Sequence, residues 1–259
     1  MRILSCNVRL DNPAVDQENQ WACRRAWCCD AIRSIRPDVV CTQELGRAQF
    51  LDLAAALPEH GSFGMADTAA GRAPMNTIFY RRDAFDRISA GGYWLSETPH
   101  VPGSRSWDSD CVRLANWLRL VQRTSGLEFR VLNTHLDHVS QAARENQARL
   151  LNEDAAAYPP DYPQVLAGDM NSGPANPVIA AFRDAGWGDT YGAVRGEADP
   201  GTTFHRFLGP ALDVAGAKID WIFSKGRARA TGADIFRDAR DGRFPSDHYF
   251  LWADIELVR

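Results

Sequence analysis

Short apolar segments recur along the whole chain, and they are connected in two different ways. Apolar residues at helical spacing predict helices over 21–35, 47–57, 141–157 and 176–185, which separate some of these segments. Elsewhere a tight turn such as Arg123-Thr-Ser-Gly126 joins two alternating segments into an antiparallel pair. A chain that mixes both connections does not suit an all-parallel sheet. We therefore predict an α/β fold with four layers, in which two mixed or antiparallel β-sheets pack face to face between helices.

The apolar segments themselves predict the strands of these sheets. The expected strands are 2–8, 38–42, 75–80, 88–95, 111–121, 127–132, 164–168, 218–223, 229–236 and 249–257. The chain has 259 residues, of which 45% are hydrophobic, and this is enough for one large α/β core. No linker, repeat or low-complexity stretch divides it, so we predict a single domain over 1–259.

Charge and cysteine content narrow the classes of protein to consider. The net charge is −4 with both signs scattered, so the basic stripe typical of non-specific duplex binders is missing. No apolar run approaches the length of a membrane span, and no signal segment precedes the first strand. The six cysteines lack the paired spacing of metal ligands. We expect free thiols in a cytoplasmic protein, and we predict no protein partner.

One stretch, Val165-Leu-Ala-Gly-Asp-Met-Asn-Ser-Gly-Pro174, shows where chemistry would be found. It begins as a short buried strand and ends as a loop. Asp169 and Asn171 lie at the end of that strand, and residues two apart in a strand point to the same side. A carboxylate and a carboxamide would therefore project together beyond the edge of a sheet, where α/β proteins often bind ligands. Capping of a turn explains the same two residues equally well.

Polar side chains stand at the ends of several other predicted strands, namely Asn7, Glu44, His135, Asp220, Asp247 and His248. Carboxylate and amide oxygens are the ligands that Mg²⁺ and Mn²⁺ prefer, whereas a zinc site would need more histidine or cysteine. The set suits metal-assisted transfer of a phosphoryl group to water. The chain has neither the Gly-x-x-x-x-Gly-Lys-Ser/Thr loop of nucleotide-driven enzymes nor the Gly-x-Ser-x-Gly motif of serine esterases.

In this order the motifs resemble those of the endonuclease/exonuclease/phosphatase superfamily, which includes deoxyribonuclease I, abasic-site endonucleases, deadenylases and neutral sphingomyelinases. The resemblance rests on Asn7, Gln43-Glu44, Asn133-Thr-His135, Gly168-Asp-Met-Asn171, Ile219-Asp220 and Ser246-Asp-His248. Trp21-x-x-Arg24 and Thr134-His-Leu-Asp-His138 are similar to the deadenylase-like branch and its small bacterial relatives. The resemblance implies the four-layered sandwich, a divalent metal and hydrolysis of phosphoesters.

The resemblance also implies the metal ligands and the residue that activates water. Glu44 would be the main ligand of Mg²⁺ or Mn²⁺, with Asn7 beside it. Asp247 would reach a metal directly or through water. Asp169 would orient or deprotonate the attacking water, and Asn171 would hold a phosphate oxygen. One metal ion and two remain equally open.

The histidines complete the implied active site. His135 and His248 would stabilise the charge that builds on the phosphoryl group, and Asp220 would orient His248 through a hydrogen bond. Four further residues are candidate substrate contacts, although a purely structural role explains each of them about as well. They are Arg113, His138, Arg144 and His205.

The substrate is left open by these arguments. A small phosphoester or a short nucleic acid is the preferred substrate, and the alternatives are a nuclease or 3′-exonuclease and a phospholipid diesterase. A nuclease would need a positive groove, and a lipid diesterase would need an apolar rim. A binding module without activity is a further alternative, but such a relative usually lacks one of the metal acids or histidines, and none is missing here.

Overall fold

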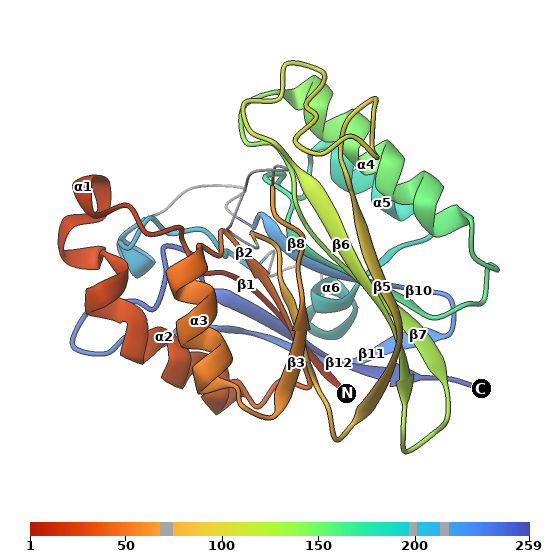
Figure 1. Ribbon diagram of the computed structural model, residues 1–259, viewed down its shortest axis with the longest axis horizontal. Helices are drawn as coiled ribbons and strands as arrows, with labels where there is room; N and C mark the ends of the chain where they lie inside the picture. The colour runs from red at the N-terminus through yellow and green to blue at the C-terminus, as the bar shows by residue number, and fades with distance from the viewer. Residues whose placement is uncertain (68–74, 197–200, 213–217) are drawn as a thin grey trace.

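The computed structural model describes residues 1–67, 75–196, 201–212 and 218–259. Within these ranges twelve strands form two sheets of six strands each (Figure 1). Sheet A has the order β11-β12-β1-β2-β4-β3 and sheet B the order β5-β6-β7-β8-β10-β9. Sheet A contains β1 (Arg2–Asn7), β2 (Val39–Gln43), β3 (His60–Phe63), β4 (Ile78–Arg81), β11 (Ala228–Phe236) and β12 (Phe250–Leu257). Sheet B contains β5 (Phe85–Trp94), β6 (Leu114–Gln122), β7 (Glu128–His135), β8 (Gln164–Asp169), β9 (Gly188–Asp189) and β10 (Asp220–Lys225).

Both sheets are mixed, as the sequence predicts. Strands β1 and β2 pair in parallel in sheet A, and β7 and β8 pair in parallel in sheet B. The other pairings between named strands are antiparallel. Helices connect the strands of each parallel pair, because parallel neighbours need a long crossover connection.

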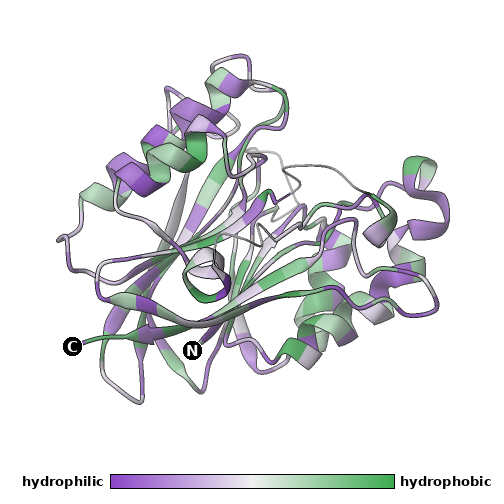
Figure 2. Ribbon diagram, turned by 180° about the vertical axis from the view of Figure 1, so that it is seen from behind, coloured by the Kyte–Doolittle hydropathy of each residue, from purple (hydrophilic) through white to green (hydrophobic). Residues whose placement is uncertain are grey.

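Helices cover the outer face of each sheet. The helices α2 (Trp21–Ile35) and α3 (Arg47–Ala56) lie on sheet A, and α4 (Gln141–Ala156) and α5 (Pro177–Asp184) lie on sheet B (Figure 1). Hydrophilic and hydrophobic positions alternate along these outer helices, as expected for helices with one buried face (Figure 2). The shorter elements are α1 (Pro13–Asp16), α6 (Thr190–Arg195) and two 3₁₀ helices, η1 (Gln17–Asn19) and η2 (Gly209–Ala211).

Three apolar clusters hold the four layers together. The largest lies between the sheets and includes Ile3, Val131 and Ile222, each fully buried. The other two pack sheet B against α4 and α5, and sheet A against α2 and α3. The predicted four-layered α/β sandwich is therefore confirmed. None of the helices in the described ranges has both the length and the apolar character that crossing a bilayer requires.

Local signals in the sequence predict most of the elements. The elements that were missed lack such signals. Helix α2 has the predicted bounds, and Ser140 caps α4 by accepting a hydrogen bond from the amide of Ala143 at 3.1 Å, as expected. Strand β3 was not predicted because its sequence, His-Gly-Ser-Phe, has no apolar alternation. It forms because its backbone pairs with that of β4. Helix α6 and strand β9 are too short to show a periodic pattern.

Candidate active site

Three neighbouring strands of sheet B bring polar residues side by side. In the pairing register Asp169 at the end of β8 lies opposite His135 on β7 and Asp220 on β10. All three are buried. Gly168 makes this close pairing possible, because a Cβ atom at this position would be 2.0 Å from the carbonyl oxygen of Thr134. The strand ends of sheet B therefore supply one wall of a common site.

Sheet A supplies the other wall through the ends of β1 and β2. Asn7 is the last residue of β1 and is fully buried, and Glu44 follows β2 with a left-handed φ of 56°. The Asn7 Nδ2 donates hydrogen bonds to Glu44 Oε1 at 2.9 Å and to Asp169 Oδ2 at 3.1 Å. A single amide thus joins a carboxylate of sheet A to a carboxylate of sheet B, so the two sheets contribute to one site.

His248, just before β12, forms a buried pair with Asp220. Its Nδ1 lies 2.8 Å from Asp220 Oδ2, and its Nε2 lies 3.8 Å from Asp169 Oδ2. Burial by itself lowers the pKa of His248, but the charge and hydrogen bond of Asp220 outweigh it and raise the pKa to about 10. His248 is therefore an imidazolium cation at neutral pH.

His135 approaches the same carboxylate in the opposite protonation state. Its Nε2 lies 3.4 Å from Asp169 Oδ2. Burial lowers the pKa of His135 well below its usual value, and the positive charges of Arg113 and His248 lower it further. His135 is thus neutral and can act only as a hydrogen-bond donor or acceptor.

Asp169 lies at the centre of these contacts and is held in a fixed orientation. Its Oδ1 accepts a hydrogen bond from the amide of Asn171 at 2.9 Å. Burial raises the pKa of Asp169 to about 7, and the charge of Asp220 adds to the effect. Asn171 has a left-handed φ of 45°, and its Nδ2 donates to the carbonyl of Leu136 at 3.0 Å. A carboxylate whose pKa is near neutrality is suited to general base catalysis.

Asp247 and Glu44 are a second pair of acids, on the side of sheet A. Burial raises the pKa of Asp247, and the negative charge of Glu44 also raises it. The pKa of Glu44 is lowered: burial opposes the charged form, but hydrogen bonds from Asn7 and from the amide of Leu10 overcome that cost. Two cations oppose this shift of the Asp247 pKa, first His248 and then Arg9, whose Nε is 4.0 Å from Oδ2.

These side chains surround a cavity of about 660 Å³. Asn7 and Asp220 are buried and meet the cavity only through their hydrogen-bond partners. A separate cavity of about 510 Å³ beside α2 and β3 carries none of the predicted site residues. The predicted catalytic and metal residues that line the larger cavity are Glu44, His135, Asp169, Asn171, Asp247 and His248.

The four candidate substrate contacts divide into two groups. Arg113 and His138 line the cavity, and the Nε of Arg113 has no hydrogen-bond partner among the described residues. Arg144 instead donates to the carbonyl of Asp137 at 3.0 Å. His205 is fully buried and stacks on Tyr249 with ring centroids 4.0 Å apart. Neither Arg144 nor His205 lines the cavity, so we do not carry these two forward as substrate contacts.

Two residues that shape the cavity were not singled out from the sequence. Arg9 lines it next to Asp247, but its position in a polar loop gave no signal. Asp137 is fully buried and accepts hydrogen bonds from several backbone amides around the cavity rim. The spacing of two between His135, which ends β7, and Asp137 could have pointed to it.

The donor groups fit a hard divalent cation. Asp169, Asp220 and His248 offer ligand atoms within 4.8 Å of one another, but Asp220 Oδ2 already pairs with His248 Nδ1. This makes the trio a hydrogen-bonded relay rather than a ligand set. Glu44 and Asp247 are acids that line the cavity, and their carboxylates form no hydrogen bond to a histidine among the described residues. Such oxygen donors suit Mg²⁺ and Mn²⁺.

Comparisons with known proteins identify the family of this chain. The family model described as endonuclease/exonuclease/phosphatase family matches residues 4–248. An endonuclease/exonuclease/phosphatase from Bacteroides vulgatus is 31% identical with a TM-score of 0.89, over 99% of this chain and 98% of that one. A mannosyl-6-phosphatase from Bacteroides thetaiotaomicron is 28% identical with a TM-score of 0.87, over 99% of this chain and all of that one.

A curated relative, Nocturnin of Drosophila melanogaster, is 29% identical over 174 residues, which are 62% of this chain. The match spans about a quarter (26%) of Nocturnin's own length. The family match spans residues 4–248, and the residues that line the cavity fall within it. This chain therefore belongs to the endonuclease/exonuclease/phosphatase family.

Proposed function

We propose that this protein is a hydrolase of phosphoester bonds that depends on Mg²⁺ or Mn²⁺. The observation that carries the proposal is the convergence of Glu44, Asp169 and His248 on one cavity. These side chains come from both sheets and are linked through the amide of Asn7 and the carboxylate of Asp220. Members of the family to which the chain belongs are phosphoester hydrolases.

Each residue of the site has its own role in the proposed reaction. Asp169 orients the attacking water and takes its proton, since its pKa of about 7 suits a base. The imidazolium of His248, maintained by Asp220, stabilises the negative charge that develops on the phosphoryl oxygens. Neutral His135 donates a hydrogen bond to the same oxygens, and Asn171 holds one of them through its amide.

A divalent cation would be held by Glu44 and Asp247, with Asn7 fixing the position of Glu44. When bound, it supplies positive charge that polarises the phosphoryl group and binds water. It would also favour the ionised form of Asp169, whose pKa is raised by burial in its absence. Asp247 and Glu44 repel each other, which adds to burial in raising the pKa of Asp247, and this repulsion supports the assignment.

Within this class we propose a small phosphoester, such as a sugar phosphate, as substrate. Two observations support the choice over a nucleic acid. The cavity of about 660 Å³ is bordered by Arg113, Arg105 and His138, which suits a compact anionic ligand, and the net charge of −4 does not favour a polyanion. A relative that matches over the whole chain is a mannosyl-6-phosphatase.

A panel of phosphoesters tests the proposal. We expect the purified protein to hydrolyse bis-p-nitrophenyl phosphate or a hexose 6-phosphate with Mg²⁺ or Mn²⁺, and EDTA to stop the reaction. Asp169→Asn and His248→Ala should each reduce kcat by at least ~10²-fold, the scale of a lost base or charge stabiliser. His205→Phe, which preserves the buried aromatic contacts, is the matched control and should stay within a few fold.

The outcomes separate the alternatives. Faster cleavage of short oligonucleotides than of any small phosphoester would favour the nuclease, and preference for a phospholipid would favour the lipid diesterase. Rates close to wild type in both Asp169→Asn and His248→Ala would overturn the mechanism. No hydrolysis of any member of the panel, with folded protein, would favour a binding module.

A cytoplasmic location remains our prediction, supported by six free cysteines.

A further inference from the structure

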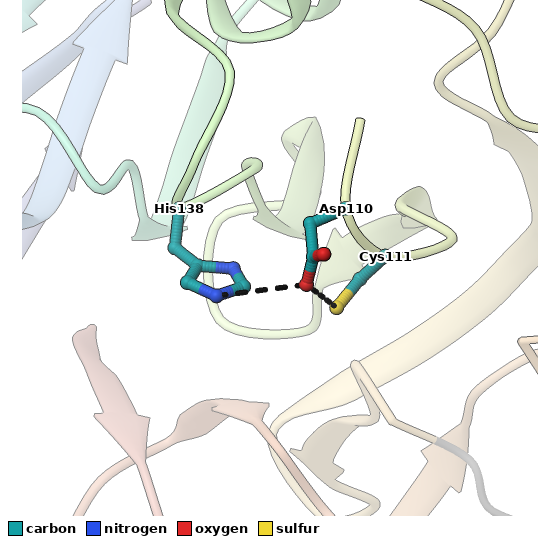
Figure 3. Close-up of side chains that lie close together, drawn as sticks. All are labelled: Asp110, Cys111 and His138. Carbon is teal, nitrogen blue, oxygen red and sulfur yellow. Dashed lines mark hydrogen bonds and ion pairs between the residues drawn. The ribbon is translucent and has the colours of Figure 1, made fainter. Parts of the chain in front are cut away.

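A second group of metal-ligating side chains lies at the rim of the catalytic cavity. Asp110 and Cys111 come from the loop that precedes β6, and His138 follows β7. Figure 3 shows the three side chains pointing toward one another across the gap between these segments. The Asp110 Oδ2 is 3.5 Å from Cys111 Sγ and 3.7 Å from His138 Nε2, and all three ligand atoms lie within 4.8 Å of one another.

We propose that Asp110, Cys111 and His138 form a binding site for Zn²⁺ that is separate from the Mg²⁺ or Mn²⁺ site. Ligands of a tetrahedral zinc ion are about 3.4–3.6 Å apart, given the usual Zn–O, Zn–N and Zn–S bond lengths. The separations of Asp110 Oδ2 from Cys111 Sγ and from His138 Nε2, 3.5 and 3.7 Å, are already close to these values. A thiolate, an imidazole and one carboxylate suit zinc far better than magnesium, which prefers oxygen ligands.

One buried carboxylate fixes the backbone of both ligand segments. The Oδ2 of Asp137 accepts from the amides of Asp110 at 2.8 Å and Cys111 at 3.3 Å. Its Oδ1 accepts from the amides of Val139 at 3.0 Å and Ser140 at 2.7 Å. Asp137 itself is fully buried. The ligands are thus arranged before a metal arrives, which reduces the conformational entropy that binding costs.

The two ring nitrogens of His138 face different partners, Nδ1 an arginine and Nε2 the proposed zinc ion. The Nη2 of Arg113 lies 3.2 Å from His138 Nδ1, and an arginine can only donate, so in the metal-free protein the proton of the neutral ring is on Nε2. Zinc at Nε2 requires that proton to move to Nδ1, and the Cys111 thiol releases its proton to solvent. The contact from Arg113 is then lost. Zinc binding therefore removes one contact of the Arg113 guanidinium, which also lines the catalytic cavity and keeps its Nε 4.0 Å from Asp137 Oδ2.

The site is accessible to ions. The side chains of His138 and Asp110 are 49% and 56% exposed, and Cys111 is partly exposed. Asp110, Cys111 and His138 also line the same cavity as the catalytic groups. Three protein ligands leave a fourth tetrahedral position for water or for an oxygen of a bound ligand.

Cobalt absorption tests the site directly. Co²⁺ replaces Zn²⁺ in such sites and gives a thiolate-to-metal absorption band in the near ultraviolet. The wild-type protein should develop this band to one equivalent of Co²⁺, and excess Zn²⁺ should remove it. Cys111→Ser and His138→Ala should abolish or strongly weaken it. Cys23→Ser, which removes an exposed cysteine elsewhere, should retain it. A band that persists in Cys111→Ser would overturn the proposal.

Alkylation of the unchanged protein gives a second test that needs no variant. Zn²⁺ should slow the reaction of Cys111 with iodoacetamide at least ~10-fold, because a metal-bound thiolate is a poor nucleophile, and leave Cys23 unaffected. Mass spectrometry of the two peptides measures both rates. Equal rates for Cys111 with and without Zn²⁺ would contradict the site. Glu44→Gln should keep both signals, so the outcome does not depend on the proposed phosphoesterase activity.

Discussion

His135 and His248 contact the same carboxylate but differ in charge, and their surroundings explain the difference. The Nε2 atoms lie 3.4 and 3.8 Å from Asp169 Oδ2. Only His248 has a carboxylate on its other ring nitrogen, Asp220 at 2.8 Å. His135 instead faces the positive charge of Arg113, which lowers its pKa in addition to burial. One histidine therefore supplies charge and the other supplies a neutral hydrogen bond.

This difference gives a prediction for Asp220→Asn. The charge of Asp220 raises the pKa of His248 to about 10, so activity that needs the imidazolium is present below that pH and is lost as pH rises through it. Removal of the charge lowers this pKa, so the alkaline limb of the kcat/KM profile should move down by ~1 pH unit or more. Asp234→Asn on β11 is the control and should leave the limb in place. An unmoved limb in Asp220→Asn would separate Asp220 from the charge on His248.

At the residue scale the sequence predicted the catalytic residues but not the metal-ligating cluster at the rim of the cavity. Glu44, Asp169 and His248 were predicted because each lies at the end of an apolar strand, in the order of the family motifs. The cluster of Asp110, Cys111 and His138 was not predicted, since His138 is 27 and 28 residues from the other two in sequence and no spacing rule connects them. The same limit applies to His205, whose burial against Tyr249 depends on distant segments.

Among the elements, helix α2 contributes more to the site than its position outside sheet A suggests. Arg24 on this helix is only 3% exposed. Its guanidinium donates to the carbonyls of Val8 and Arg9, both at 2.6 Å, and of Pro245 at 3.1 Å. The first two follow Asn7, and the third precedes Asp247. One side chain therefore connects the loop after β1 to the loop before β12, and both loops carry site residues.

Replacement of Arg24 by methionine should affect stability and activity together. The variant leaves several buried carbonyls without their charged donor, so the free energy of unfolding should fall by about 3 kcal/mol, and kcat should fall as the two loops move. Arg25→Met is the matched control: Arg25 is exposed on the same helix and pairs only loosely with Asp52, at 3.5 Å. Its effect should be within about 0.5 kcal/mol. Urea unfolding measures both, and equal stability of the two variants would disprove the role of Arg24.

Long elements were predicted correctly because they show several repeats of apolar spacing. Short elements were missed, and the strands among them form through backbone pairing with other segments. Helices α2 and α4 contain 15 and 16 residues, long enough to show apolar spacing and end signals. Strand β3 has four residues and exists because its backbone pairs with β4, which lies about 15 residues later in the chain. Helix α6 has six residues and begins at a cap formed by Asp189. Such short elements carry too few residues for a pattern.

At the scale of the whole molecule, buried polar contacts join the two sheets near the site. The Gln43 Nε2 donates to Asn133 Oδ1 at 2.7 Å, and Asn133 Nδ2 donates to the carbonyl of Thr42 at 2.7 Å. Together with Asn7 and Asp169, these contacts run from sheet A to sheet B through an otherwise apolar interface. The buried donors and acceptors fix how the sheets face each other, because an unpaired buried polar group is costly.

The assembly of two sheets around one edge was predictable from the sequence only in outline. The mixed order of helices and hairpins indicated two packed sheets, and the motif order indicated a shared site. The cross-sheet contacts of Asn7 and Gln43 could not be read from spacing, since their partners Asp169 and Asn133 are 162 and 90 residues away. The prediction that residues 1–259 form a single domain remains a prediction.

The central claim is that Glu44 and Asp247 hold one type of hard cation at this edge, and binding of Mn²⁺ measures it most directly. Calorimetric titration should be done in a Cys111→Ser background, which removes the rim cluster as a competing site. The protein should bind Mn²⁺, and Glu44→Gln should weaken that binding by at least ~10-fold, because a charged ligand becomes neutral. Equal affinity with and without the Glu44 carboxylate, or no binding of Mn²⁺ to the folded protein, would contradict the account.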